Sequence, residues 1–386
     1  MSEQYDVIVI GGGVAGLSTA ANITEGNVLL LEKDRIRTEE KRYLRFTFMD
    51  SVERLGISEC IIRRYDTISF QASANRLDVE YNDFEFGLID LGKLHRKLMK
   101  YILKKNEIKE KWVVVDVKNR NKMIEVKISH DDTIEKILTR YLVDASGTSF
   151  LTKKIFNLPH PDFICHCCEA TFSGGYIGDP HTITFIEPST RFKFGGSLYP
   201  YDKGDYSFGL TNNLDFFNLS LKSFEKKIMK EKNDLGLSDK IEGGDICVSN
   251  IDLVPLGSQY SLIFDGVCYV GDTVGQVTPW MIEGVRPCLD ASIMCANAIN
   301  AALKQQEKSL LERYKKGWDS TYGVVYNKVN LAEKWNRTNE EWNNSLKRMM
   351  KLSKMSKKLF LRYLKYDQMS EDAIERLMEL KTSLDK

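Results

Sequence analysis

The feature that most constrains the fold is a glycine-rich segment near the N-terminus, between two apolar runs. Residues 7–10 read Val-Ile-Val-Ile, the pattern of a parallel strand buried on both faces. Residues 11–16 follow as Gly-x-Gly-x-x-Gly and open a predicted helix over 17–23. A second apolar run, 28–31, ends at an acidic residue. The segment therefore predicts the strand-turn-helix-strand unit that begins a doubly wound α/β domain.

Each glycine of this segment has a physical role in such a unit. Gly11 allows a tight turn, Gly13 lets a pyrophosphate approach the backbone, and Gly16 lets the helix pack closely on the strand. Glu32, about 20 residues after the first glycine, is placed to accept a hydrogen bond from a ribose hydroxyl. A carboxylate there would repel a 2′-phosphate, so the segment favours FAD or NAD over NADP; an ordinary glycine-rich turn is the alternative. The expected cofactor contacts are Gly11, Gly13, Val14, Ala15, Gly16, Glu32 and Lys33.

Composition excludes several classes of protein. With 386 residues, 42% hydrophobic and 28% charged, the chain reads as a globular protein of about two domains. The formal net charge is +1, which gives no global field to attract nucleic acid. Residues 7–23 are uncharged, but they are too few for a membrane span and contain four glycines. No secretory signal precedes the eight irregularly spaced cysteines, so we expect a cytoplasmic protein.

A second pattern, far along the chain, separates FAD from NAD. Residues 267–270 again read as a buried strand followed by Gly-Asp, residues 278–285 read Thr-Pro-Trp-Met-Ile-Glu-Gly-Val, and a small-residue helix is predicted over 287–303. Another strand ends in a tight turn over 141–147. This order resembles the FAD-dependent oxidoreductases with the p-hydroxybenzoate hydroxylase-like fold. In that family the Gly-Asp pair contacts the pyrophosphate and ribityl chain, and a helix N-terminus stabilises the negative charge of reduced flavin. The resemblance implies FAD, with further contacts from Gly271, Asp272, Pro279, Gly284 and Val285.

Within that fold the chain is most similar to the geranylgeranyl reductases. Those enzymes carry an aromatic-Pro motif followed by glycines, matched here by Tyr199-Pro200, Gly204 and Gly209. Two departures stand out: the stretch 37–48 lacks the family's cysteine, and small residues replace the Tyr and Trp that usually precede the motif. The C-terminal part also resembles theirs, with a long helix followed by a segment rich in tyrosine and tryptophan (Tyr314, Trp318, Tyr322, Tyr326 and Trp335).

The resemblance and the strand pattern together predict an α/β fold: a Rossmann-type FAD-binding domain, an inserted antiparallel-sheet substrate domain and a C-terminal helical subdomain. Alternating strands and turns, at 182–187, 193–199 and 205–211, indicate the antiparallel sheet. The expected boundaries are 1–60, 88–155 and 250–315 for the FAD-binding domain, 61–87 and 156–249 for the substrate domain, and 316–386 for the helical region.

Several side chains are candidates for the reaction itself. Trp280 lies in the predicted flavin-binding stretch 278–285 and is expected to line the substrate pocket, with core packing as the alternative. Glu283 is a candidate proton donor, if burial raises its pKa, or a cap at the helix start, and Arg286 could pair with it or hold an anion. Residues 165–168 read Cys-His-Cys-Cys, but side chains on one strand alternate between faces, so we expect no metal site. The predicted substrate-pocket residues are Cys165, Cys167, Tyr199, Pro200 and Trp280.

These predictions lead to one functional hypothesis with three rivals. Reduced flavin would deliver hydride to a carbon–carbon double bond of a prenyl or other lipid chain, using NAD(P)H or ferredoxin as the electron donor. The rivals are a flavin monooxygenase, a lycopene cyclase-like enzyme without net redox turnover, and a non-catalytic flavin-binding protein. Residues 346–366 combine basic residues with an apolar stripe and no acid, which suits either a peripheral membrane contact or a core-packed helix with a basic outer face.

Overall fold

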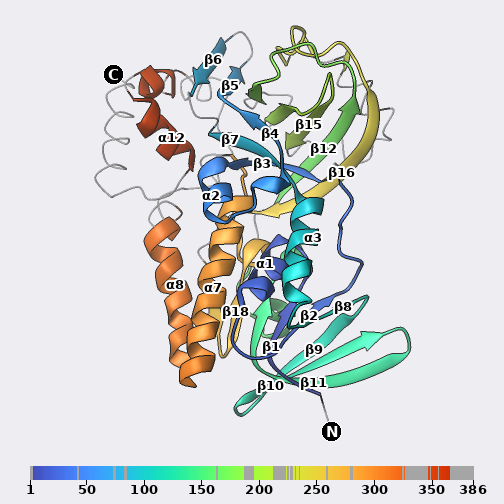
Figure 1. Ribbon diagram of the computed structural model, residues 1–386, viewed down its shortest axis with the longest axis vertical. Helices are drawn as coiled ribbons and strands as arrows, with labels where there is room; N and C mark the ends of the chain where they lie inside the picture. The colour runs from blue at the N-terminus through green and yellow to red at the C-terminus, as the bar shows by residue number, and fades with distance from the viewer. Residues whose placement is uncertain are drawn as a thin grey trace. The chain divides into compact units, whose positions relative to one another are not determined.

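The computed structural model forms two compact units, each assembled from separate stretches of chain (Figure 1). Unit 1 comprises Met1–Tyr43, Leu91–Ile164 and Pro255–Asn327, and unit 2 comprises Leu44–Asp90, Cys165–Val254 and Lys328–Lys386. The structure describes residues 3–40, 43–72, 75–81, 85–161, 164–186, 195–211, 223, 226, 229–230, 232–233, 235–257, 260–278, 281–323, 326, 347, 349–354 and 356–365.

The two units and the predicted domains divide the chain at different places. Residues 44–60, expected in the FAD-binding domain, lie in unit 2, and residues 316–327, expected in the helical region, lie in unit 1. The three-domain division stays a prediction.

Unit 1 is built on a sheet whose centre is parallel. Strand β1 (Gln4–Ile10) lies between β2 (Val28–Glu32) and β11 (Thr133–Asp144) and pairs in parallel with both. Residues 7–9 have no exposed surface, as expected of a strand covered on both faces. In the described chain the sheet order is β17-β18-β11-β1-β2-β8, and β10 joins β11 to β9. The remaining strands are β8 (Glu107–Glu110), β9 (Val113–Arg120), β10 (Met123–His130), β17 (Ile263–Phe264) and β18 (Val267–Tyr269).

Helices of unit 1 carry the N-terminal and C-terminal parts of the cofactor pattern side by side. The helix α1 (Val14–Asn22) packs along α7 (Val285–Gln305). The Ser292 hydroxyl donates to the Ala15 carbonyl at 3.1 Å, and the Asn300 amide donates to the Asn22 carbonyl at 3.0 Å. The predicted helix over 287–303 is therefore present and two residues longer at each end. The other α-helices of the unit are α3 (Leu91–Ile102), α4 (Leu151–Ile155) and α8 (Glu312–Trp318).

Unit 2 contains the predicted antiparallel sheet. Its order is β16-β12-β15-β14-β13-β5-β6 in the described residues, with only the β13–β5 pair parallel among the pairs resolved. A second, three-stranded sheet has the order β3-β7-β4. The strands of the large sheet are β5 (Thr67–Ala72), β6 (Asn75–Glu80), β12 (Ile164–Ser173), β13 (Thr182–Ile186), β14 (Gly196–Pro200), β15 (Tyr206–Thr211) and β16 (Asp245–Pro255). Those of the small sheet are β3 (Leu44–Phe48), β4 (Ile61–Tyr65) and β7 (Phe86–Asp90).

Strand β7 runs directly into a helix: it continues to Asp90, and α3 begins at Leu91. The reason is pairing: Ile89 lies opposite Arg45 of β3 and Ile61 of β4, so both edges of this strand are hydrogen-bonded.

The C-terminal helix α12 (Lys357–Lys365) packs its apolar side into unit 2. The Phe360 ring is fully buried and lies 6.1 Å from the ring of Phe70. Lys365 donates to Asp50 of α2 (Met49–Arg54) at 2.8 Å. Among the described helices, none is long and apolar enough to cross a membrane.

Candidate cofactor site

The glycine turn after β1 has the geometry that the sequence predicts. Gly11 has a φ of +107°, and a Cβ there would lie 2.2 Å from the Ala145 carbonyl oxygen, so only glycine fits between β1 and β11. A Cβ on Gly16 would lie 1.8 Å from the carbonyl oxygen of Gly11, which is the close helix–strand contact. Gly13, in contrast, is exposed and has nothing within 4 Å of its Cβ position. Two glycines of the motif are required by the fold, and the third leaves open space over the start of α1.

Glu32 stands at the end of β2 beside this turn. Its carboxylate accepts hydrogen bonds from the Gly12 N–H at 2.5 Å and from the Asp34 N–H at 2.9 Å. These bonds fix the carboxylate where a ribose hydroxyl is expected to bind. The next residue, Lys33, is exposed, and its amine lies 4.0 Å from the Asp34 carboxylate.

The Gly271-Asp272 turn lies against the start of α1. Gly271 has a φ of +73°, and a Cβ there would lie 2.7 Å from the Ala15 Cβ. Gln276 holds the turn by accepting the Gly271 N–H at 2.7 Å and donating to the Tyr314 hydroxyl at 2.9 Å, and that hydroxyl donates to the carbonyl of Tyr269. Asp272 is half-buried at the first turn of the 3-10 helix Gly271–Val274. Two glycine turns more than 250 positions apart thus meet at one helix end.

A third turn completes this edge of the sheet. Asp144, the fully buried last residue of β11, accepts the N–H of Ser146 at 2.9 Å and both the N–H and the hydroxyl of Thr152, at 2.8 and 2.6 Å. The N–H of Gly147 then donates to the Thr273 hydroxyl at 3.1 Å. The structural role of Asp144 was not predicted from the sequence, although one signal was present: a single acidic residue at the end of an apolar strand.

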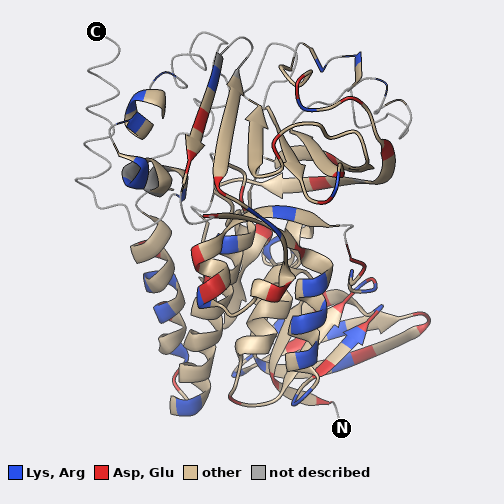
Figure 2. Ribbon diagram, turned by 45° about the horizontal axis from the view of Figure 1, so that its top comes forward, with Lys and Arg blue, Asp and Glu red and all other residues tan. Residues whose placement is uncertain are grey.

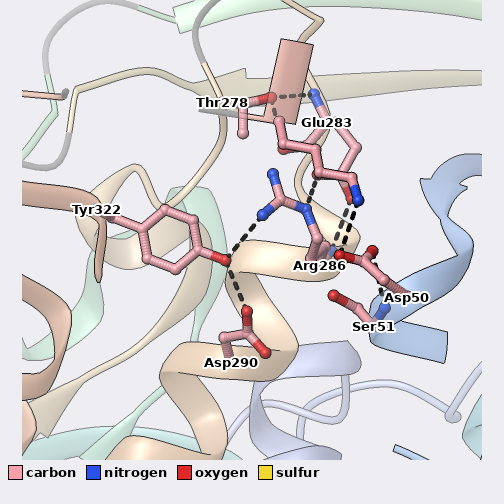
Figure 3. A network of polar contacts seen from close by, with 8 residues as sticks. Asp50, Ser51, Thr278, Glu283, Arg286, Asp290 and Tyr322 are labelled. Atoms are coloured by element: carbon pink, nitrogen blue, oxygen red, sulfur yellow. Dashed lines mark hydrogen bonds and ion pairs between the residues drawn. The ribbon is translucent and has the colours of Figure 1, made fainter. Parts of the chain in front are cut away.

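At the start of α7, Glu283 and Arg286 belong to a buried polar group that we call the helix cluster (Glu283, Arg286, Asp290 and Tyr322; Figure 3). The Glu283 carboxylate accepts the Arg286 N–H at 2.7 Å and lies 3.5 Å from the Arg286 guanidinium. That guanidinium donates to the Tyr322 hydroxyl at 3.2 Å, and the hydroxyl donates to Asp290 at 2.7 Å. This geometry favours a role for Glu283 as a cap at the start of α7. Its other predicted role, as a proton donor, stays a prediction.

The loop before α7 is closed by reciprocal hydrogen bonds. The Thr278 N–H donates to the Glu283 carbonyl at 2.8 Å, and the Glu283 N–H donates to the Thr278 hydroxyl at 3.1 Å. Gly284 is the N-cap of α7 and Val285 its first residue, so the first N–H groups of the helix point out of its N-terminal end. Pro279 and Trp280 lie outside the described residues, and their predicted roles stay predictions.

The other predicted pocket residues lie in unit 2. Cys165 and Cys167 share one face of β12; Cys165 is buried, and the Cys167 thiol lies 3.8 Å from the Thr211 hydroxyl. Burial raises the pKa of Cys167 to about 12, so this thiol is protonated near neutral pH and is a poor nucleophile. Tyr199 and Pro200 are buried at the end of β14, where the Pro200 carbonyl accepts the Tyr65 hydroxyl at 2.6 Å. The described His, Cys, Asp and Glu side chains include no group of three that could hold a metal ion.

Comparisons with known proteins give matches in both sequence and structure. A model of the lycopene cyclase protein family matches residues 6–164. The digeranylgeranylglycerophospholipid reductase 1 of Methanococcoides burtonii is 24% identical over 349 residues, which cover 84% of this chain and 81% of that protein. A crystal structure of a geranylgeranyl bacteriochlorophyll reductase-like protein from Thermoplasma acidophilum has a TM-score of 0.79 at 15% identity and covers 98% of this chain and 100% of that chain. The myxobacterial chondrochloren halogenase CndH, named as an FAD-dependent halogenase, has a TM-score of 0.64 at 17% identity over 84% of this chain and 81% of that one.

These matches confirm the resemblance and the fold class predicted from the sequence. The chain is similar in sequence to proteins named geranylgeranyl reductases and has the mixed α/β fold of flavin-dependent enzymes, with a helical C-terminal region. The predicted cofactor, FAD, agrees with this fold.

Proposed function

We propose that the protein is an FAD-dependent oxidoreductase that reduces carbon–carbon double bonds in a prenyl or other lipid chain. The observation that carries the cofactor assignment is the contact between the turns at Gly11 and Gly271 through the start of α1. The similarity to geranylgeranyl reductases supports the substrate class.

The residues of unit 1 fit FAD. The open backbone at Gly13 and the N-terminus of α1 suit the pyrophosphate, and Glu32 suits the adenosine ribose. Asp272 is placed for the pyrophosphate and ribityl chain, and the N-terminus of α7 after Gly284 for the electron-rich edge of the flavin. When bound, FAD supplies the hydride chemistry, and the chain's own residues bind the cofactor, orient it and stabilise its charge.

Unit 2 has the chemistry that an apolar substrate needs. Isolated alkenes are poor hydride acceptors, so the reaction depends on positioning and on exclusion of water. Around the predicted pocket residue Tyr199, the rings of Phe46 and Phe185 lie 6.4 and 6.1 Å away, and the Phe70 ring lies 5.8 Å from that of Phe185. This aromatic face supports binding of a hydrocarbon chain rather than of a small polar substrate.

The cofactor assignment is tested with a pair of glycine variants. Gly13→Ala is expected to fold normally, because its Cβ meets nothing, but to bind FAD about tenfold or more weakly, because the methyl group keeps the pyrophosphate from the backbone. Gly11→Ala is expected to destabilise unit 1 itself, since its Cβ would meet Ala145. Flavin absorbance and fluorescence titration measure binding, and circular dichroism measures folding. Unchanged FAD affinity in Gly13→Ala would contradict the assignment.

The reaction is tested with the purified flavoprotein. Reduced by dithionite and incubated with geranylgeranylated glycerophospholipids, it is expected to increase the lipid mass by two hydrogens per double bond reduced. Heat-inactivated protein and reduced free FAD are the controls. Unchanged lipids across prenyl chains of several lengths would overturn the proposal.

The family match to lycopene cyclases supports one second candidate, a flavoenzyme without net redox turnover. Such an enzyme would rearrange a polyene while the product mass stays unchanged. The same mass spectra decide between the two, because reduction adds hydrogen and cyclisation does not.

We also propose NAD(P)H or ferredoxin as the electron donor.

A peripheral membrane contact through residues 346–366 is proposed as well, but without insertion of apolar side chains into the lipid. Within that stretch the apolar residues Met349, Leu352 and Phe360 are buried in the protein, so they are unavailable for insertion into lipid. The exposed part is basic, and Figure 2 shows Lys and Arg on the C-terminal helices. Any contact would therefore be electrostatic and should weaken as salt rises. The exposed lysines are Lys347, Lys351, Lys354, Lys357 and Lys358.

A further inference from the structure

One face of the large sheet in unit 2 carries a partly buried group of charges that has no role in the proposed function so far. Arg45 of β3 forms ion pairs with Glu169 of β12 and with Asp252 of β16. The Ser207 hydroxyl of β15 donates to the other oxygen of Glu169 at 2.5 Å. We call Arg45, Glu169, Asp252 and Ser207 the sheet cluster. The side chains of Arg45, Glu169 and Asp252 are only 28%, 15% and 31% exposed.

The sheet cluster has one carboxyl group more than it has cations. With both carboxyls ionised, its formal charge is −1, and a net charge held largely away from water is costly. A single added proton makes the cluster neutral. Burial raises the pKa of Glu169, while the Arg45 guanidinium and the Ser207 hydroxyl act in the opposite direction. The net shift of the Glu169 pKa is upward, so burial favours its protonated form.

The position of Glu169 relates it to the predicted substrate pocket. Strand alternation places it on the same face of β12 as Cys167, opposite the face that packs Cys168 and Ala170 into the apolar core. On the neighbouring strand β15, Glu169 pairs with Gly209, which has no side chain. Two residues earlier on β15, Ser207 pairs with the predicted pocket residue Tyr199 of β14. The carboxyl therefore lies beside two predicted pocket residues, with a glycine as its direct neighbour.

We propose that Glu169 is the proton donor for reduction of the double bond, with Arg45 and Asp252 as positioning residues. This inference rests on the proposed function. With FAD bound and reduced, the cofactor would supply the hydride, a proton with two electrons, to one alkene carbon. The Glu169 O–H bond would break to protonate the other carbon, so that two C–H bonds replace the π bond and the flavin is left oxidised. The Glu169 carboxylate would stay paired with Arg45 until solvent returns a proton.

The titratable groups that face Glu169 in the described part of unit 2 fit this role. Arg45 is cationic, and Asp252 shares it as a counter-ion. Burial raises the pKa of Cys167 to about 12 and that of Tyr199 above its ordinary value, so both stay neutral and hold their protons too tightly to donate them readily. Glu169 is a carboxyl whose pKa is raised by burial, and we therefore assign it as the acid of the cluster.

The first test measures alkene reduction in a single turnover of the reduced flavoprotein, at several pH values. Glu169→Gln is expected to slow reduction at least about 100-fold, because the amide cannot donate as an acid. Glu169→Asp should restore part of the rate. In the wild type the rate should fall as pH rises through the pKa of Glu169. Asp252→Asn removes a negative charge next to Glu169, lowers its pKa and should move this fall to lower pH. Glu80→Gln, on an exposed position of β6 in the same sheet, is the matched control.

The second test does not require turnover. The infrared spectrum of the wild-type protein near neutral pH should contain the C=O stretch of a protonated carboxyl that is absent from Glu169→Gln and present in Glu80→Gln. Circular dichroism and flavin content should be the same in the three proteins. If the band is the same in the wild type and Glu169→Gln, the inference is overturned.

The two tests separate this inference from the proposed function. A wild type that reduces no prenyl lipid refutes the proposed function, and Glu169 then has no alkene to protonate whether or not it carries the infrared band. A wild type that reduces lipid while Glu169→Gln keeps its rate and pH profile refutes the inference alone. Loss of the rate, the pH dependence and the band together supports both.

Discussion

The helix cluster of unit 1 and the sheet cluster of unit 2 have the same composition but different surroundings. Each combines one arginine with two carboxyl groups and one hydroxyl. In the helix cluster a carboxylate caps the N-terminus of α7, where the helix dipole and the free N–H groups stabilise negative charge. In the sheet cluster the carboxyls lie on a β-sheet, which has only a small net dipole.

The two settings differ in how the backbone compensates negative charge. At the start of α7 the free N–H groups and the helix dipole stabilise the Glu283 carboxylate, which serves as fixed structure. A sheet face offers no such compensation, and burial raises the pKa of Glu169. The helix cluster fixes the loop before α7, whereas the sheet cluster holds a group that can change its charge during a reaction.

The largest effect is expected from Arg286→Met. The variant removes the guanidinium that lies beside Glu283 and that reaches Asp290 through the Tyr322 hydroxyl. Both carboxyls are buried, at 3% and 8% exposed, and we expect a loss of about 3–5 kcal/mol in the free energy of unfolding. Urea denaturation followed by circular dichroism measures it. Arg313→Met, on the exposed side of α8, should change stability by less than about 0.5 kcal/mol. A loss below about 1 kcal/mol for Arg286→Met would show that the cluster is not a structural ion pair.

Arg45→Met is expected to cost less and to depend on pH. Its two carboxyls are partly exposed and can take up protons, so we expect a loss of about 1–3 kcal/mol. Without Arg45, the pKa of Glu169 in the folded state rises further. The folded protein then binds protons more readily than the unfolded chain, so the loss should grow as pH increases through this raised value. Unfolding curves at pH 5 and pH 8 provide the comparison, and equal losses would contradict the assigned difference between the clusters.

Tyr322→Phe tests the hydroxyl that joins Arg286 to Asp290. Both partners are buried, and removal of the bridging group should lower the free energy of unfolding by about 1–2 kcal/mol. The ring remains, so its contact with Trp318, at 4.5 Å between centroids, should be kept. Tyr101→Phe, at a position 48% exposed on α3, is the control. Equal unfolding midpoints for the two variants would argue against the bridge.

Ser207→Ala should have the smallest effect on stability, about 0.5–1.5 kcal/mol, and a clear effect on protonation. The Ser207 hydroxyl stabilises the ionised form of Glu169 and so lowers its pKa. Without it that pKa should rise, and the infrared band of the protonated carboxyl should persist to higher pH. A band that titrates at the same pH as in the wild type would show that the hydroxyl does not affect the charge of Glu169.

The strand, glycine turn and helix at the start of unit 1 were predictable because the sequence pattern that specifies them is local. A buried strand, a glycine turn and a helix start occupy consecutive residues, and the steric need for glycine at Gly11 and Gly16 is independent of the rest of the chain. The assignment of the Gly271 turn to the same cofactor was implied by family resemblance. In the structure this turn lies against Ala15, at a close approach that only a glycine permits.

The sheet cluster was not predictable in the same way. Arg45 lies 124 positions from Glu169 and 207 from Asp252, and nothing in the pattern of charges pairs them. One signal was present: Glu169 interrupts an otherwise apolar or weakly polar strand at a position whose neighbours are buried. For Glu283, the spacing of three residues to Arg286 at a helix start already indicated the cap, and the choice between cap and acid required the hydrogen bond to the Arg286 N–H.

The interleaved course of the chain has a consequence for its synthesis. Strand β18 joins β11 in the central sheet of unit 1 more than 100 residues after β11 is made, and α12 completes the apolar interior of unit 2 close to the C-terminus. Neither unit can finish folding as the nascent polypeptide leaves the ribosome, because each waits for late segments. Until then, the unpaired edge of β11 and the uncovered Phe70 are exposed to other chains, so we expect the yield of native protein to depend on chaperones and to fall sharply if the chain is cut before residue 356.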